Sequence, residues 1–300
     1  MCVRQLLGFG LCVALSSVAA HGQAIPFSFT GTVTQTNTDP ADPFAGAVGL
    51  GTIFSGSFVF NGAAADALPA DPLTGSYTSN AAPYRMIGNI GGRVFTVDAA
   101  LHIGVVNNYP SSLDQYAVLA RDTDGSLVLE FLLEDPGGTA FSTDALPLTA
   151  PLLANFASAR FTFTAQNIDG NYVEILGTID SLALLPPTFV SVIPGVVRPG
   201  DQITITGTGF LGDVQVFFNG VAGVVQVVDE NTLIVIVPNL PLGPVTLTVT
   251  TTGGSVTSPP GALQIGSSVP TLSEWGLVLL FTALLGGGLI RLRNRNGWLH

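Results

Sequence analysis

The stretch Gln202-Ile203-Thr204-Ile205-Thr206 decides the fold class of the chain. Polar and apolar residues alternate along it, so Ile203 and Ile205 share one face of a half-buried strand. Gly207 and Gly209 follow and permit a tight bend. Further β-rich runs lie between Gly/Pro turns at residues 214–218, 224–228, 233–237 and 245–250. The sequence therefore predicts a small all-β domain here.

Short motifs of turn and strand residues recur through the same segment. They are Pro194-Gly195, Pro199-Gly200-Asp201, the run from Ile203 to Phe210, Val216-Phe217-Phe218-Asn219-Gly220, Val237-Pro238 and the run from Gly243 to Thr250. In this order they resemble the IPT/TIG domain, an immunoglobulin-like sandwich. The resemblance implies a domain over residues 187–266 that serves as a binding or spacer module and carries no catalytic site. Such a fold does not specify a ligand.

Residues 25–185 also show the two-residue period of β-strands. The period is clear in Phe54–Phe60 and clearest in Phe95–Ile103, where it predicts one continuous strand. We expect Asp122-Thr123-Asp124-Gly125 to turn a hairpin. About eight such strands predict a β-sandwich or jelly-roll-like N-terminal domain. Pro186-Pro187 marks its boundary, because adjacent prolines resist continuation of a sheet or helix.

The composition excludes several classes of function. The chain has no lysine, and between its two apolar ends five arginines stand against nineteen acidic residues, a formal charge of −14. A body this acidic is repelled by phosphates, so we exclude nucleic-acid binding. Cys2 and Cys12, the only cysteines, both lie in the first apolar segment. We therefore expect neither a disulfide framework nor a cysteine metal site after export.

The N-terminus has the order of a secretory signal peptide, predicted over residues 1–24. Arg4 precedes an apolar run at residues 6–18, and small residues follow. Cleavage after Ala20 and cleavage after Ala24 both remain open. This prediction makes the secretion translocase and signal peptidase partners of the chain. An uncleaved N-terminal anchor is the alternative, although the run is short for a membrane span.

The C-terminus, residues 269–300, combines a motif, an apolar segment and a basic end. The motif is Val269-Pro270-Thr271-Leu272-Ser273-Glu274-Trp275-Gly276. The uncharged run 275–290 is expected to form a transmembrane helix of about 24 Å. The basic end, residues 291–295, contains Arg291, Arg293 and Arg295 and is expected to stay cytoplasmic. The body then lies outside the inner membrane.

This tail resembles the IPTL-CTERM sorting signal, which is related to the PEP-CTERM signals of Gram-negative bacteria. The family begins its motif with Ile, and Val269 stands in that position here. The resemblance implies recognition by an exosortase, a membrane-embedded Cys transpeptidase, which removes the tail and transfers the protein to the cell surface or extracellular matrix. An ordinary single-span anchor is the alternative interpretation.

No catalytic constellation stands out. His21 leaves with the signal peptide or lies beside it, and His300 lies in the tail, so His102 is the only histidine expected in the β-body. On the predicted strand it shares an outward face with Asp98 about 13 Å away. That is too far for a catalytic hydrogen bond, so we interpret His102 as a solvated strand residue. Paired carboxylates could hydrolyse glycosides, and the candidates are Glu130, Glu134, Asp135 and Glu174. We expect no enzyme and no cofactor.

Calcium is the one ion that the sequence makes plausible. Asp122 and Asp124 place two hard oxygen ligands on a tight turn, with Gly125 beside them. The spacing fails the EF-hand pattern, because position 12 of such a loop falls on Leu133. An ordinary hairpin turn explains the same residues.

Three hypotheses follow from these observations. The first is a non-catalytic surface protein sorted by an exosortase, which binds extracellular polysaccharide or another surface protein. The second is a surface polysaccharide hydrolase that uses carboxylates of the N-terminal domain. The third is a plain single-span membrane-anchored protein that keeps its C-terminal helix.

Overall fold

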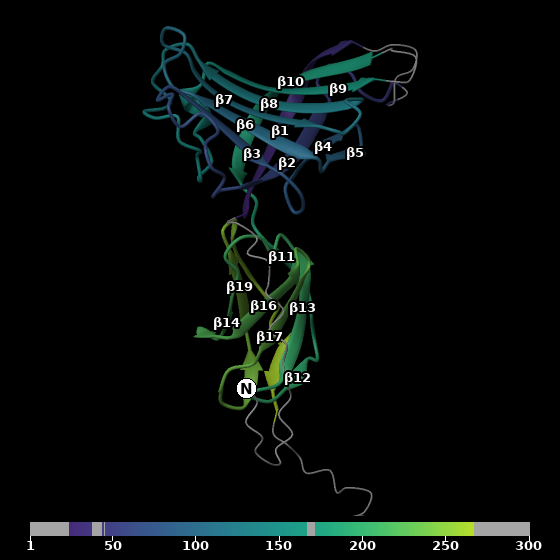
Figure 1. Cartoon of the computed structure of the whole chain (residues 1–300). Helices are drawn as coiled ribbons and strands as arrows, with labels where there is room; N and C mark the ends of the chain where they lie inside the picture. The colour runs from purple at the N-terminus through teal and green to yellow at the C-terminus, as the bar shows by residue number, and fades with distance from the viewer. Residues whose placement is uncertain (1–23, 38–43, 45, 167–171, 267–300) are drawn as a thin grey trace, which may run out of the picture.

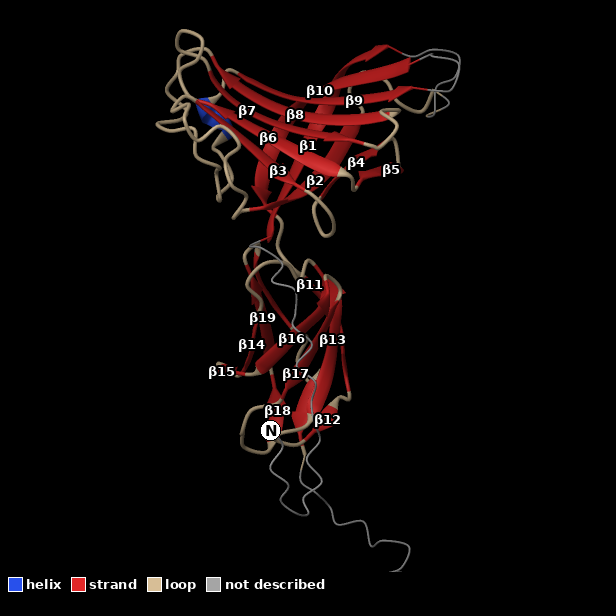
Figure 2. Cartoon of the chain, viewed as in Figure 1, coloured by secondary structure: helices blue, strands red, loops and turns tan. Residues whose placement is uncertain are grey.

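Two β-domains follow one another along the chain in this computed structural model, which describes residues 24–37, 44, 46–166 and 172–266. Figure 1 shows them joined end to end, with the N-terminal domain above. Nearly all regular structure is strand, beside one short 3-10 turn, η1 (Leu153–Asn155) (Figure 2), so the all-β prediction is confirmed. No helix in these ranges is long and apolar enough to cross a membrane. The helix expected at residues 275–290 lies outside the described residues.

The N-terminal domain is a single ten-stranded antiparallel sheet in the order β3-β6-β7-β8-β9-β10-β1-β2-β4-β5. The sheet bends until its halves face each other, and β4 contacts β6 and β8 across the interior. The two layers of the expected sandwich thus belong to one continuous sheet. Its strands are β1 (Ala24–Asn37), β2 (Ile53–Asn61), β3 (Thr74–Ser79), β4 (Arg85–Ile90), β5 (Arg93–Val97), β6 (Ala100–Val106), β7 (Asp114–Arg121), β8 (Leu127–Asp135), β9 (Ser158–Gln166) and β10 (Tyr172–Leu184).

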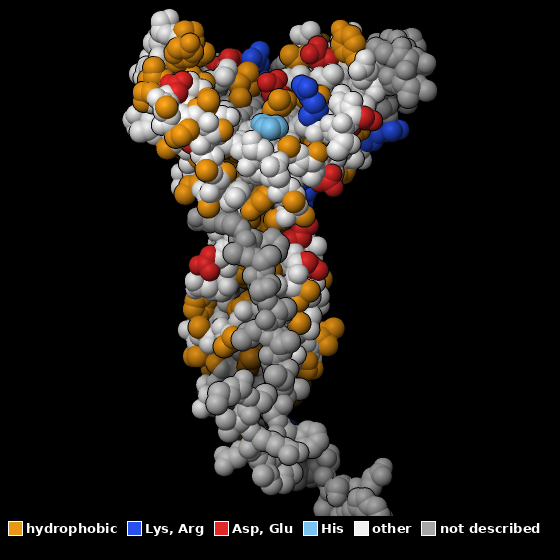
Figure 3. All heavy atoms as spheres, in the orientation of Figure 1, with side chains coloured by type: hydrophobic (Ala, Val, Ile, Leu, Met, Phe, Trp, Pro, Cys, Tyr) orange, Lys and Arg blue, Asp and Glu red, His pale blue; other side chains and the backbone are white. Residues whose placement is uncertain are grey.

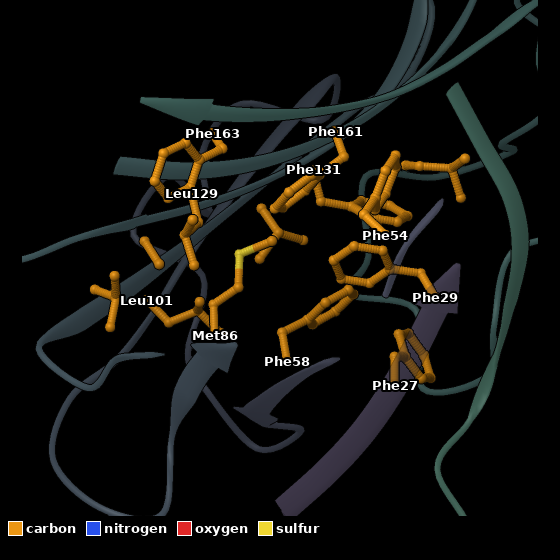
Figure 4. Packing of buried hydrophobic residues seen from close by; sticks show 14 of the residues in the cluster. Phe27, Phe29, Phe54, Phe58, Met86, Leu101, Leu129, Phe131, Phe161 and Phe163 are labelled. Atoms are coloured by element: carbon orange, nitrogen blue, oxygen red, sulfur yellow. The ribbon is translucent and has the colours of Figure 1, made fainter. Parts of the chain in front are cut away.

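Phenylalanine rings fill the space between the two halves of this sheet (Figure 4). The ring centroid of Phe29 lies 5.1 Å from that of Phe161 and 5.3 Å from that of Phe131. Phe54 stacks on Phe161 at 5.1 Å. All four side chains are buried. Each such ring pair adds about 0.5–1.5 kcal/mol to the free energy gained from burial alone, so this cluster is the main source of cohesion in the domain.

Three glycines make room for these rings. A Cβ atom at Gly31 or Gly177 would collide with the ring of Phe54, and one at Gly56 would collide with the ring of Phe29. Gly31 also lies at a register shift between β1 and β10. The missing side chains therefore let aromatic rings rest directly on the backbone at the point where the sheet bends.

The C-terminal domain is a sandwich of a β11-β13-β17-β16 sheet against β15-β14-β19-β20 and β12-β21-β18. Ile203 and Ile205 of β13 are buried, as their alternation predicts. Asn219 and Gly220 have φ values of 48° and 88° and close the predicted two-residue hairpin. The strands are β11 (Thr188–Ile193), β12 (Val196–Val197), β13 (Gln202–Thr208), β14 (Gln215–Phe218), β15 (Val221–Ala222), β16 (Val224–Asp229), β17 (Thr232–Ile236), β18 (Gly243–Val245), β19 (Leu247–Thr251), β20 (Gly254–Thr257) and β21 (Leu263–Ile265).

The prediction of one continuous strand over Phe95–Ile103 is wrong. The chain leaves the sheet at Asp98, and the two halves become β5 and β6. β5 forms one edge of the sheet beside β4, whereas β6 lies between β3 and β7 in the other half. Val97 and Leu101 are both buried, because both halves face the same core. The two-residue period survives the break, so alternation alone could not reveal it.

The two domains meet at a small apolar joint. Leu211, in the loop between β13 and β14, is buried with Ala24, Val59 and Tyr84 of the N-terminal domain. Beside them the Nη2 atom of Arg85 donates to Glu230 Oε2 at 2.7 Å. The ion pair joins β4 to the turn between β16 and β17. We refer to Leu211, its three apolar neighbours and this ion pair as the joint.

Backbone also approaches backbone at the joint. A Cβ atom at Gly253 would collide with the carbonyl oxygen of Leu185, and one at Gly212 would lie 2.8 Å from that of Ala24. Both Cβ-to-oxygen contacts would be closer than carbon and oxygen atoms that are not bonded to each other tolerate. Larger residues at these two glycines would hold the domains apart, so the sequence of the C-terminal domain is fitted to this contact.

We predict that Gly31→Ala lowers the free energy of unfolding of the N-terminal domain by about 1–3 kcal/mol, because the new methyl group collides with both the carbonyl oxygen of Thr178 and the Phe54 ring. Urea denaturation followed by Tyr fluorescence measures the effect. Gly104→Ala is the matched control, since nothing lies within 4 Å of a Cβ atom there. It is expected to change stability by no more than about 0.5 kcal/mol. Equal losses in the two variants would contradict this account of the bend.

A second prediction concerns the joint. Leu211→Ala removes a side chain that is only 5% exposed, and comparable losses cost about 2–5 kcal/mol. We expect calorimetry of the variant to show the two domains unfolding at more widely separated temperatures than in the parent. Leu242→Ala is the control on the same domain, because Leu242 is 67% exposed. An unchanged calorimetric profile for Leu211→Ala would show that the contact does not couple the domains.

Candidate functional site

A row of polar side chains crosses the outward face of the N-terminal sheet. Gln115 on β7 donates from Nε2 to Glu134 Oε1 on β8 at 3.2 Å. Arg160 on β9 donates from Nη2 to Glu134 Oε2 at 3.1 Å. Each of the three lies at an outward position of its strand, because its sequence neighbours face the core. We call Gln115, Glu134 and Arg160 the outer-face row.

A hollow of about 550 Å³ lies beside the outer-face row, over strands β1, β9 and β10. Figure 3 shows the surface of the N-terminal domain dipping between two raised ends, with charged side chains of both signs among uncharged ones. Thr32 Oγ1 donates to Asp180 Oδ2 at 2.8 Å on the same outward face. The hollow is lined by Thr34, Gln35, Ala157, Ser158, Ala159, Arg160, Leu176, Gly177 and Thr178.

This arrangement suits binding through many hydrogen bonds. The Arg160 side chain is 47% exposed, so donors remain free beyond the one that bonds Glu134. Threonine hydroxyls and the Gln35 amide add groups that both donate and accept. Leu132 pairs directly with Arg160 across the strands and is buried, which gives the row an apolar floor. The surface therefore offers both kinds of polar group in fixed positions.

His102 is exposed on β6, where Thr78 Oγ1 lies 3.1 Å from its Nδ1 atom. Asp98 lies outside both flanking strands, so the expectation that it shares an outward strand face with His102 is wrong. The reason is the break in the chain between β5 and β6. A single threonine contact orients the imidazole but supplies no acid or base partner.

The four candidate carboxylates are separated by the fold. Glu130, Glu134 and Glu174 all face outward on β8 and β10. Glu130 and Glu134 are four residues apart on one strand, about 13 Å. Glu174 lies two strands from Glu130, which puts their Cα atoms about 12 Å apart. Glu134 is held by Gln115 and Arg160, and Asp135 points into a loop instead.

Asp135 and Asp114 pin two loops at the end of the sheet. They lie opposite each other on β8 and β7, and both are buried. Asp135 accepts hydrogen bonds from the backbone N–H groups of Gly137 and Thr139, each at 2.8 Å. These bonds hold the pKa of Asp135 below its ordinary value, Thr139 having the larger effect.

Asp114 was not among the residues singled out by the sequence. Its carboxylate accepts from the backbone N–H of Asn108 at 2.8 Å and of Phe141 at 2.7 Å. A signal was available, because Asp114 stands two residues before the buried Tyr116 and therefore at an inward position of the strand. A charged residue in such a position needs several donors.

The carboxylates of Asp122 and Asp124 organise the predicted hairpin turn. Asp122 accepts from the Leu127 backbone at 3.0 Å and from Ser126 Oγ at 2.9 Å. Asp124 accepts from the Ser126 backbone at 2.9 Å, and this bond lowers its pKa. The described part of the chain holds no group of three His, Cys, Asp or Glu side chains suited to a metal ion. Calcium binding at this turn stays a prediction.

The predicted sorting residues lie outside the described residues. They are Val269, Pro270, Thr271, Leu272, Ser273, Glu274, Trp275 and Gly276, with Arg291, Arg293 and Arg295 behind them. Residues 1–23 of the predicted signal peptide also lie outside them.

Comparison with protein families identifies two segments. Residues 187–265 match the family model of the IPT/TIG domain, and residues 267–295 match that of the IPTL-CTERM motif. The chain carries an IPT/TIG domain followed by an IPTL-CTERM motif. The IPT/TIG domain is the lower domain of Figure 1, and the IPTL-CTERM motif begins directly after Gly266, the last described residue. A C-terminal sorting signal of this kind indicates an exported or cell-surface protein.

Similarity to solved structures is slight. The gamma-CGTase from alkalophilic Bacillus clarkii is 17% identical over 52% of this chain and 24% of its own, with a TM-score of 0.25. SGBP-B of the Bacteroides ovatus mixed-linkage glucan utilization locus, in complex with a mixed-linkage heptasaccharide, is 11% identical over 81% of this chain and 60% of its own, with a TM-score of 0.23. The chain spans less than two thirds of either structure, and neither score supports an argument. No curated protein matches the chain.

The pKa of Asp135 yields a pH prediction. Because the folded-state pKa is depressed, the carboxylate stabilises the fold above its unfolded pKa of about 3.9, and this contribution is lost as pH falls through the folded value. Asp135→Asn removes it. We expect the parent to be more stable than the variant in urea at pH 6, and the difference to shrink steadily below pH 4. Asp98→Asn is the control, and a difference independent of pH would contradict the prediction.

Proposed function

We propose that the chain is an exported surface protein whose IPT/TIG domain holds the N-terminal domain away from its point of attachment, and whose outer face binds extracellular polysaccharide without catalysis. In this proposal an exosortase recognises the IPTL-CTERM motif and removes the tail. The secretion translocase and signal peptidase act earlier on the N-terminus. The match to the IPTL-CTERM motif supports the sorting step.

The observation that carries the proposal is the position of the joint relative to the chain's exit from the IPT/TIG domain. The joint lies at one end of that domain, and β12 and β18 lie at the other (Figures 1 and 2). β21, the last strand before the tail, pairs with both β12 and β18. A protein attached through its tail would thus present the N-terminal domain at its outer tip. Such an arrangement favours a spacer role for the IPT/TIG domain.

The chemistry of the outer face supports a neutral, hydroxyl-rich ligand. Each sugar hydroxyl donates and accepts, and the outer-face row with the adjacent threonines offers partners for both roles. A polyanion is disfavoured, because the body of the chain carries a formal charge of −14. A strand-lined hollow open at its sides also accommodates an extended polymer.

The sorting step has a direct test in a strain that carries an exosortase. We expect the intact mass of surface-released protein to lack the C-terminal tail. Deletion of residues 269–276 is expected to leave a full-length form in the membrane, because the processing enzyme has lost its motif. Val269→Ile, which restores the first residue of the family motif, is expected to process normally. Released protein that still ends at His300 would favour a plain single-span anchor instead.

Binding is tested with a panel of neutral and acidic polysaccharides. We expect the exported protein to be retained by a neutral polysaccharide, and Arg160→Ala to weaken retention about tenfold, as for loss of a central polar anchor. Arg198→Ala, an exposed arginine on the IPT/TIG domain, is the matched control. Retention by no polysaccharide would overturn the binding role. Release of new reducing ends would favour a hydrolase that uses Glu130 or Glu174.

A further inference from the structure

Strand β16 lies at an open edge of the IPT/TIG domain. In the sheet β11-β13-β17-β16 its one neighbour among the described strands is β17. The run Val224-Val225-Gln226-Val227-Val228 reads the same in both directions and carries no charge. Edge strands are usually protected by lysine, proline or an inward-pointing charge, and this run has none of them. It therefore presents a row of backbone donors and acceptors to a further strand.

The side chains of this run alternate between the core and the solvent. Val225 and Val227 pack partly against the core of the domain. Val224 and Val228 face outward and are 68% and 51% exposed, although Glu230 just beyond them is held at the joint. The N-terminal domain thus leaves both ends of the run accessible. Exposed apolar side chains on an uncharged edge form an association surface.

The symmetry of the run fits a second copy of this chain. When two identical strands pair antiparallel about a two-fold axis, each residue meets the one at the mirrored position. With the axis at Gln226, Val225 of each copy lies opposite Val227 of the other, and Val224 lies opposite Val228. Apolar side chains then meet on both faces of the ladder. The two glutamine amides meet on the axis, where each both donates and accepts.

Backbone register and charge favour the same antiparallel pairing. The ladder between β16 and β17 is unbroken from Val224 to Val227, so the strand is regular through the axis. Asp229, the first acidic residue after the run, would lie opposite Gly223 of the second copy. The two Asp229 residues are then about 20 Å apart, well beyond the Debye length of about 8 Å at physiological salt. Parallel pairing would instead set them side by side.

We propose that two copies of the chain associate through β16, antiparallel about Gln226, and join their sheets into one. A contact of one short strand per copy is smaller than the roughly 1,200 Å² of a stable interface, so the dimer is weak and reversible. β16 leads to the joint, so the two N-terminal domains lie at opposite ends of the pair. If the tail attaches the chain, the pair links facing surfaces; this consequence rests on the proposed function, whereas the pairing does not.

Cysteine cross-linking of the exported protein tests the register. Gln226→Cys places two thiols on the axis with Cα atoms about 4.5–5.5 Å apart, a separation that a disulfide spans. Val224→Cys is the matched control, because its exposed thiol lies about 13 Å from its counterpart. We expect Gln226→Cys to form the disulfide-linked dimer at least about tenfold faster under mild oxidation. The parent protein reveals any cross-linking through Cys2 or Cys12.

Analytical ultracentrifugation measures the association without added thiols. Gln226→Lys sets two like charges opposite each other on the axis and is expected to weaken the dimer about tenfold or more. Gln202→Lys makes the same change at an exposed position of β13, inside the sheet, and is expected to leave the dimer unchanged. Each body carries a formal charge of −14, so we expect added salt to strengthen the parent dimer.

Three results would overturn the pairing. Equal cross-linking rates for Gln226→Cys and Val224→Cys would contradict the register. A parent protein that sediments as a monomer at its highest soluble concentration, in low and high salt, would exclude a second copy as the partner of β16. A dimer of equal strength in Gln226→Lys and Gln202→Lys would place the contact on another surface. None of these results bears on polysaccharide retention, so the pairing and the proposed function fail separately.

Discussion

The N-terminal domain depends on the contact between the Phe54 ring and the bare backbone of two glycines. Gly31 and Gly177 lie in the neighbouring strands β1 and β10, and the ring occupies the space of their absent side chains. This close approach lets one sheet bend far enough to cover its own aromatic core. The outward face becomes hollow over β1, β9 and β10, next to the same bend. Core packing and the candidate binding surface thus have one physical origin.

The joint links the bent sheet of the N-terminal domain to the IPT/TIG domain. β1 and β10 begin and end beside it, so the strands that bend around Phe54 also fix the place where the IPT/TIG domain is attached. Leu211 supplies apolar burial, and the ion pair of Arg85 and Glu230 is only about three-quarters buried. Partly exposed pairs contribute modestly, about 0–1 kcal/mol, so burial of Leu211 contributes more to the joint than the ion pair does.

Much of the fold was predictable from local signals. The strand at Gln202–Thr206, the Asn219-Gly220 hairpin and the turn at Asp122–Gly125 depend on neighbours in sequence, and all three are present. The break within Phe95–Ile103 was not predictable, because both halves bury alternate residues in the same core. The outer-face row depends on register across three strands, and the joint on one leucine in a loop. Single-strand periodicity contains neither kind of information.

The outer face is better suited to binding than to chemistry, and the reason is its exposure. The Arg160 side chain is 47% exposed and that of Glu134 is 26% exposed, so water screens both charges. Catalytic charges act most strongly where water is excluded and the dielectric is low. An open sheet face instead spreads many weak contacts along a polymer, and each contact needs only a fixed donor or acceptor. The same bend that exposes this face places it at the end of the molecule opposite β12, which pairs with β21, the last described strand.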